Sequence, residues 1–105
     1  MEYEDFLKKY GPNFDSFSNG VTEFVLTWDD AKENVHLILR RDEEHTGDEI
    51  AGLLTDTAKV SSAIFNTAEF VSSEDVIFPH DPEDPNVPTP IWIFKVDVNR
   101  EAVEL

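Results

Sequence analysis

Apolar and polar residues alternate over three stretches of the chain, and this two-residue period predicts three β-strands. The strands cover residues 21–28, 35–41 and 91–98. A short polar segment joins the first two, so we expect them to form an antiparallel hairpin. One face of each strand is apolar, and these faces carry Phe24, Leu26 and Trp28, then Val35, Leu37 and Leu39, and finally Trp92, Phe94, Val96 and Val98.

A helical period predicts a short helix over residues 2–10, which ends at Gly11-Pro12. Residues 12–20 are rich in Pro, Asn, Ser and Gly, a composition typical of a loop. We expect Phe14 and Phe17 to attach this loop to the core.

A second helix is expected to begin at Thr46, because Glu49 stands where it would complete a capping box. The residues that follow leave two alternatives. One is a single helix of about 20 residues, and the other is a helix that ends near Lys59 and is followed by a strand over residues 63–71. The apolar run 76–78 predicts another short strand.

These elements predict an α+β fold, a small two-layer sandwich of three to four mainly antiparallel strands with one or two helices on one face. A chain of 105 residues fits one domain, and no repeat or change of composition divides it. We therefore expect residues 1–105 to form a single acidic domain.

The charge balance is strongly acidic, with 23 acidic and 8 basic residues and a formal net charge of −15. Residues 1–52 carry −8 and residues 53–105 carry −7, so the acidity is not confined to a tail. Contacts with phosphate groups require Lys and Arg. The balance therefore argues against direct binding to nucleic acid or to a membrane. It favours a basic protein partner, and self-repulsion favours a monomer or a weak dimer.

Motifs that would carry chemistry are missing from the sequence. The chain has no cysteine, no serine-nucleophile signature, no phosphate-binding loop and no histidine spacing typical of zinc. We predict no cofactor, no dedicated metal site and no catalytic residue, which makes an enzyme the less favoured interpretation. The first ten residues are too charged for a secretory signal, so we expect a cytoplasmic protein.

Five of the six prolines lie between Pro79 and Pro90. From Pro79 to Pro88 a proline stands at every third position, which is the period of a polyproline II helix. Such a loop would serve either as a rigid link between strands or as a stiff contact surface. In the second case Asp81, Glu83 and Asp84 would project from it.

A second acidic group lies between the predicted strand 35–41 and the helix. Asp48 and Glu49 fall in the first helical turn, where the helix dipole favours negative charge. Asp42, Glu43 and Glu44 have no such structural role. We therefore predict a partner-binding surface made of two groups, Asp42, Glu43 and Glu44 with Asp81, Glu83 and Asp84.

The leading hypothesis is a protein-binding or inhibitory module that acts through its negative surface. It would either imitate a nucleic acid or neutralise a basic toxin or nuclease, as immunity-type antagonists do. One alternative is a small ligand-binding domain or enzyme with a pocket near residues 79–90. The other is that the charge serves only solubility or adaptation to high salt.

Overall fold

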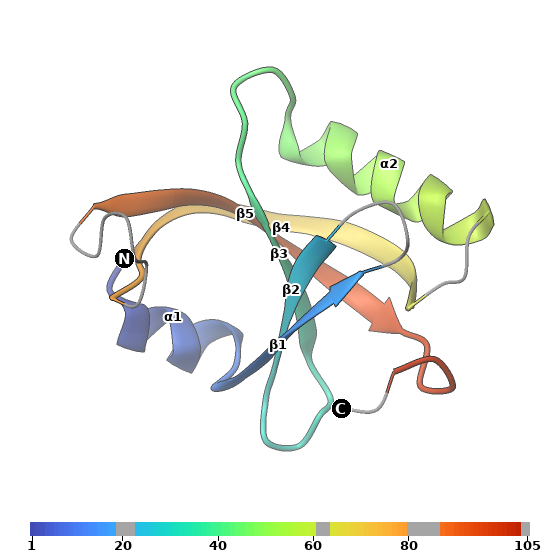
Figure 1. The fold of residues 1–105 in the computed structure, drawn as a ribbon, viewed down its shortest axis with the longest axis horizontal. Coiled ribbons are helices and arrows are strands. Elements are labelled where there is room, and N and C mark those ends of the chain that lie inside the picture. Colours follow the sequence, from blue (N-terminus) through green and yellow to red (C-terminus); the bar gives the residue numbers. More distant parts are fainter. Residues whose placement is uncertain (19–22, 61–63, 80–86, 104–105) are drawn as a thin grey trace.

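The computed structural model describes residues 1–18, 23–60, 64–79 and 87–103 (Figure 1). Over these residues the chain forms two helices and one five-stranded sheet, whose strands are hydrogen-bonded in the order β1-β2-β3-β5-β4. Every neighbouring pair is antiparallel. The elements are α1 (Tyr3–Tyr10), β1 (Asn13–Ser18), β2 (Glu23–Trp28), β3 (Val35–Arg40), α2 (Gly47–Val60), β4 (Phe65–Ile77) and β5 (Pro88–Val98).

The predicted α+β fold with antiparallel strands is confirmed, and the sheet has five strands where three or four were expected. The predicted hairpin is confirmed as well. β2 and β3 are antiparallel, with Trp28 opposite Val35 and Val25 opposite Ile38.

The additional strand is β1, so the prediction of a loop over residues 12–20 is wrong for residues 13–18. β1 pairs with β2 from Asn13, opposite Trp28, to Ser18, opposite Glu23. Its many polar side chains give it the composition of a loop. Because side chains alternate along a strand, Phe14 and Phe17 lie on different faces of the sheet. Phe17 packs against the core as expected, whereas Phe14 is 55% exposed.

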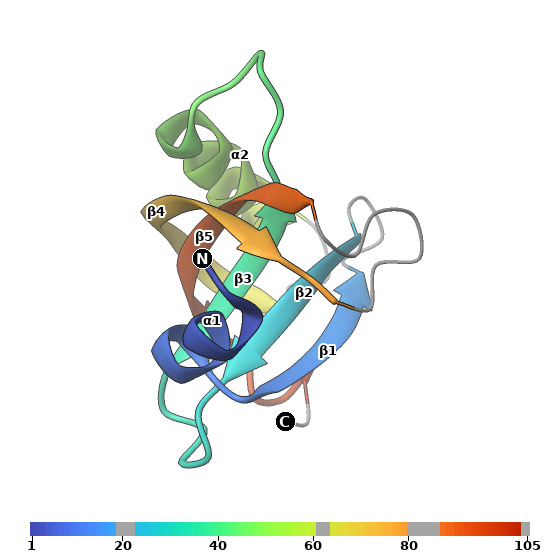
Figure 2. The same cartoon turned by 90° about the vertical axis from the view of Figure 1, so that its left-hand side faces the viewer.

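The two faces of the sheet carry separate hydrophobic clusters, and one helix packs against each cluster. The side chains of β5 show the division. Trp92 and Phe94 belong to the cluster that includes Ala51 and Leu54 of α2. Ile93 belongs to the cluster that includes α1. The structure therefore has one helix on each face (Figure 2), because β3 and β5 are apolar on both sides, whereas the sequence analysis expected one or two helices on a single face.

The end of α2 decides between the two alternatives for residues 47–71. The helix ends at Val60 and β4 begins at Phe65, so the shorter helix followed by a strand is confirmed. β4 then continues to Ile77 and includes the first two residues of the run 76–78, which was expected to form a separate strand. Register irregularities between Phe65 and Ala68, and between Phe70 and Ser72, interrupt its pairing with β5.

The last two prolines of the proline-rich segment lie in β5. Pro88 is opposite Ile77, so the polyproline II prediction is wrong for this residue, and Pro90, which follows the three-residue period, is opposite Asp75. The first residues of a strand tolerate a missing N–H group. The Pro90 carbonyl accepts a hydrogen bond from the Arg41 N–H at 3.0 Å. Residues 80–86, which include most of the predicted loop, lie outside the described residues.

Neither of the helices in the described part of the chain is long and apolar enough to cross a membrane.

Candidate functional site

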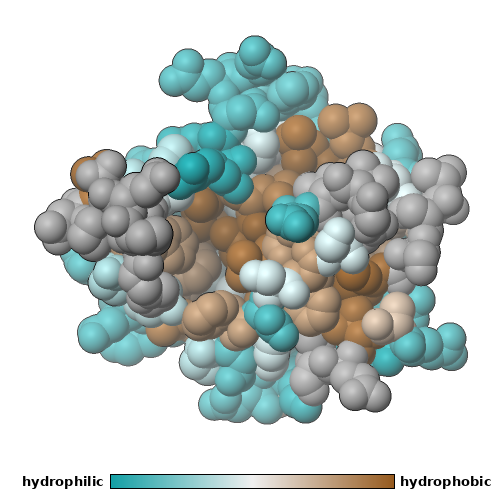
Figure 3. Space-filling view, viewed as in Figure 1, coloured by the Kyte–Doolittle hydropathy of each residue, from teal (hydrophilic) through white to brown (hydrophobic). Residues whose placement is uncertain are grey.

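The first predicted acidic group lies on a loop that projects from the end of the sheet. Residues 41–46 connect β3 to α2 and extend beyond the sheet in Figure 1. The surface around this projection is hydrophilic in Figure 3. Asp42, Glu43 and Glu44 are all exposed. The loop thus presents its carboxylates away from the core.

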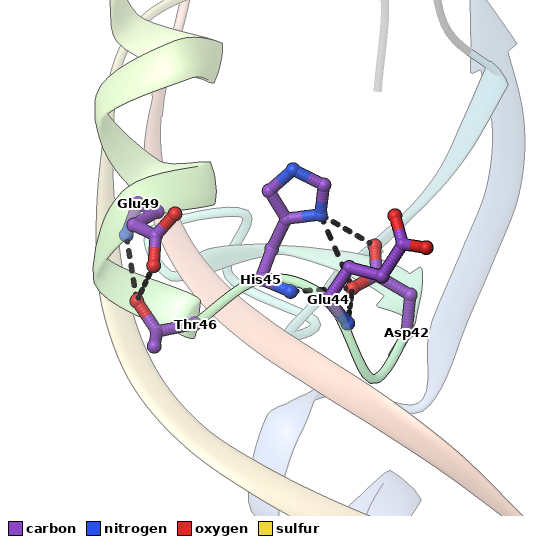
Figure 4. Close-up of polar contacts among 5 residues, drawn as sticks. All are labelled: Asp42, Glu44, His45, Thr46 and Glu49. Atoms are coloured by element: carbon purple, nitrogen blue, oxygen red, sulfur yellow. Dashed lines mark hydrogen bonds and ion pairs between the residues drawn. The ribbon is translucent and has the colours of Figure 1, made fainter.

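Asp42 holds this loop in one conformation (Figure 4). Its Oδ1 atom accepts hydrogen bonds from the backbone N–H groups of Glu44 at 3.0 Å and His45 at 2.8 Å. The Nδ1 atom of the His45 ring lies 3.2 Å from both carboxylate oxygens. An aspartate that accepts from the backbone two and three residues ahead forms an Asx-type turn. Asp42 therefore has a structural role that the sequence analysis did not assign to it.

These contacts set the acidity of Asp42. Desolvation acts to raise the pKa of this carboxyl group, but the hydrogen bonds from His45 and Glu44 favour the charged form and the net effect lowers it. The carboxylate is therefore ionised at neutral pH and remains available as a charge.

The hydroxyl group of Thr46 caps the helix that follows, which confirms the predicted cap residue. The Glu49 N–H donates to Thr46 Oγ1 at 3.2 Å, and Thr46 Oγ1 donates to Glu49 Oε1 at 3.2 Å. The Glu49 carboxylate thus returns to the hydroxyl group of the cap. This contact fixes the junction between the acidic loop and α2.

The remaining charges on the loop are unevenly compensated. Arg41 Nη2 lies 2.9 Å from Asp75 Oδ1 on β4, so this guanidinium is already engaged. Among the described residues, no hydrogen-bond or ion-pair partner is found for the carboxylates of Glu43 and Glu44. Both are open to a cationic partner.

The second predicted group, Asp81, Glu83 and Asp84, lies outside the described residues. Whether it joins Asp42, Glu43 and Glu44 in one surface remains a prediction.

A second acidic turn lies at the opposite end of the β2–β3 hairpin. Asp29 accepts hydrogen bonds from Glu33 N at 2.8 Å, from Asn34 N at 3.2 Å and from Asn34 Nδ2 at 2.9 Å. The Asn34 side chain is the main cause that lowers the pKa of Asp29, and it outweighs the desolvation that acts to raise it. This carboxylate serves the turn, so its charge alone does not mark a binding residue.

β1 contributes to the lining of two hollows, which share Val25 and Ile38. The first, named the β2–β3 hollow, has a volume of about 510 Å³ and lies where β2 and β3 diverge beyond the pair Val25–Ile38. It is lined by Phe17, Phe24 and Leu39 together with Ser16, Glu23 and Arg40. The second, named the α1 hollow, has a volume of about 180 Å³. It is lined by apolar side chains that include Tyr3, Leu7, Phe14, Val25, Ile38 and Phe78.

A third hollow of about 350 Å³ is lined by Glu2, Tyr3, Glu4, Ile77 and Pro79. It lies at the beginning of the proline-rich segment, where the alternative hypothesis places a pocket. Its two glutamates are its only titratable groups besides the Tyr3 phenol, among the residues that the structure describes.

His36 on β3 is half-buried, whereas His45, the other histidine among the described residues, is exposed. Its ring packs edge-on against Tyr10, with the centroids 5.2 Å apart, and its buried Nδ1 atom has no hydrogen-bond partner within the described structure. Desolvation is the main cause that lowers the pKa of His36, and Lys95 adds to it. The Tyr10 carbonyl and Asp29 act in the other direction.

Within the described ranges, no three His, Cys, Asp or Glu side chains come together in a way that could hold a metal ion. Comparison with protein-family models, with curated proteins and with solved structures finds no match to this chain. The assignment of a function therefore rests on the charge and the geometry described above.

Proposed function

We propose that this chain is an acidic protein-binding module that inhibits a basic partner in the cytoplasm through its negative surface. The observation that carries the proposal is the net charge of −15, spread over both halves of the chain. The projecting loop adds two exposed carboxylates, Glu43 and Glu44, to which the described structure assigns no partner. Such an array attracts a basic surface and accelerates association.

The conformation of the loop supports this function. Asp42 restrains the backbone of Glu44 and His45 through two hydrogen bonds, and the Thr46 cap fixes the start of α2. A restrained loop loses less conformational entropy when it binds than a flexible one. The carboxylates would therefore be in position before the partner binds. They would take the place of nucleic-acid phosphates on a DNA-binding protein, or cover the active surface of a basic nuclease.

A competition experiment tests the proposal. Basic DNA-binding proteins and basic nucleases are each incubated with a fluorescent DNA duplex, and the acidic protein is titrated in while fluorescence anisotropy is recorded. The proposal predicts displacement of the duplex from at least one of them. Failure to displace DNA from any, together with unchanged nuclease activity, would contradict it.

The salt-adaptation alternative makes a different prediction. If the charge serves only that purpose, the free energy of unfolding should rise steeply towards molar salt, because screening relieves self-repulsion. No basic protein should then bind at physiological ionic strength. Unfolding curves recorded from low to molar salt test this alternative, and a flat profile would reject it.

A further inference from the structure

The two edges of the sheet differ in how far the rest of the chain covers them. The outer edge of β4 is covered by other parts of the chain. Thr55 on α2 contacts both backbone groups of Ala68 at 3.3 and 3.1 Å. Met1 donates from its ammonium group to the Asp75 carbonyl at 2.6 Å and accepts from Ile77 N at 3.0 Å. This edge has little room for another strand.

The opposite edge is β1, which pairs with β2 on one side. On its other side the described residues contain no further strand. The Ser16 N–H donates to Asp15 Oδ1 at 2.8 Å. A side chain of β1 itself therefore occupies this amide. Exposed strand edges commonly serve as templates for an added strand.

Both faces beside this edge offer apolar surface. On one face Phe14, 55% exposed, forms a wall of the α1 hollow. On the other face Phe17 lines the β2–β3 hollow. Apolar surface is gathered in the middle of the side of the molecule shown in Figure 3, where β1 and β2 lie in Figure 1. Because side chains alternate along a strand, an added strand could place one side chain beside Phe14 and the next on the face that carries Phe17.

The charges along β1 favour a positively charged strand as its partner. Asp15 lies on the edge itself, Glu23 is opposite Ser18 at one end, and Asp30 accepts a hydrogen bond from Asn13 at the other end. Arg40 lines the β2–β3 hollow from the β3 side. A second copy of this chain would bring a second charge of −15 to the edge. A cationic strand would instead meet carboxylates of opposite charge.

We propose that β1 is the docking edge for an extended basic segment of the partner, which adds a sixth strand to the sheet. Its apolar side chains fill the space beside Phe14, and a Lys or Arg opposite Asp15 draws that carboxylate from the Ser16 N–H. The freed amide then donates to the added strand. This inference rests on the proposed function, because it places the basic partner on a particular edge.

A synthetic peptide of about six alternating lysine and valine residues is the probe, since this length matches β1. Its affinity is measured by calorimetry, and hydrogen exchange follows the amides of Phe14 and Ser16. The proposal predicts binding that protects these two amides. The same peptide, N-methylated along its backbone, keeps the charge but cannot pair as a strand, and it should bind at least about tenfold more weakly.

Three variants locate the site. Ser16→Pro removes the edge amide, and Phe14→Thr removes the apolar wall. Each should weaken binding at least about tenfold. Leu53 is also 55% exposed but lies on α2, so Leu53→Gln is the matched control and should bind like the original chain. If Ser16→Pro fails to fold, Phe14→Thr and the amide protection decide the outcome.

The outcomes separate this inference from the proposed function. Equal affinity for both peptides, with no amide protection on β1, overturns the docking edge and leaves the charge-based function standing. Binding that depends on β1 but not on salt supports the edge and contradicts the charge-based function. Dimerisation of the chain in sedimentation experiments, abolished by Ser16→Pro, shows that a second copy occupies the edge and overturns the proposed occupant.

Discussion

The hydroxyl group of Thr55 on α2 makes two hydrogen bonds with the backbone of Ala68 on β4. Thr55 Oγ1 donates to the Ala68 carbonyl at 3.3 Å and accepts from the Ala68 N–H at 3.1 Å. Ala68 lies beside the first register irregularity of the strand. A single side chain therefore connects the helix to the sheet and satisfies two backbone groups on the edge.

Replacement of Thr55 by Val should destabilise the protein by about 1–2 kcal/mol, because both backbone groups of Ala68 lose their partner in a half-buried place. Thr57→Val is the matched control. The Thr57 hydroxyl donates to the Leu53 carbonyl within the same helix at 2.8 Å, so its loss should cost less than about 0.5 kcal/mol. Denaturant unfolding measures both, and equal losses would contradict the role given to Thr55.

Two glycines of α2 should respond oppositely to alanine. A Cβ atom at Gly47 would overlap the Phe70 ring, whereas a Cβ atom at Gly52 would meet nothing within 4 Å. Gly47→Ala should therefore lose about 1–3 kcal/mol through overpacking against β4. Gly52→Ala should gain about 0.5–1 kcal/mol because alanine restricts the unfolded chain. Thermal unfolding would contradict this account if both variants shifted in the same direction.

His36 should make the stability depend on pH below neutrality. Its pKa in the folded state is lowered from 6.5, first of all by desolvation. Above this value the ring is neutral in both states and stability is complete. As the pH falls below 6.5, the unfolded chain takes up a proton that the folded chain resists, so the free energy of unfolding falls until the folded pKa is passed.

The variant His36→Leu should flatten that part of the pH profile. His45→Gln is the control, because His45 is exposed and lies on the projecting loop. Unfolding measured from about pH 7.5 to about pH 5 tests this. An unchanged profile in His36→Leu would show that another group titrates.

The loop carboxylates should contribute to binding but not to folding. Glu43→Gln with Glu44→Gln removes two charges without touching the hydrogen bonds of Asp42. Stability should change by less than about 0.5 kcal/mol, while association with the basic partner slows. Glu33→Gln with Glu101→Gln removes the same charge from the turn between β2 and β3 and from the segment after β5, and should slow association less. Stopped-flow mixing compares the two; equal rates would mean that net charge alone matters.

Regular alternation made β2, β3 and β5 predictable from the sequence, because each keeps one apolar face throughout. β1 escaped prediction since Asn13, Ser16 and Ser18 give it the composition of a loop. The sequence analysis divided β4 into two strands because its register irregularities change which side chains face α2. Phe70 packs with the α2 cluster, whereas Val76 packs with the α1 cluster.

The candidate site was only partly predictable for a related reason. Charge marks Asp42, Glu43 and Glu44 equally in the sequence. Only the geometry shows that Asp42 accepts the Glu44 and His45 amides while its neighbours point outward. The difference between the two sheet edges depends on which strands become neighbours, and local periodicity does not contain this information.

The most direct test of the central claim is the ionic-strength dependence of affinity for the basic protein from which the chain displaces DNA. The dissociation constant should be measured at about 50 and about 200 mM salt, over which the Debye length shortens. An interaction carried by the acidic surface predicts a steep loss of affinity at the higher salt. Affinity that stays constant across this range would contradict the account.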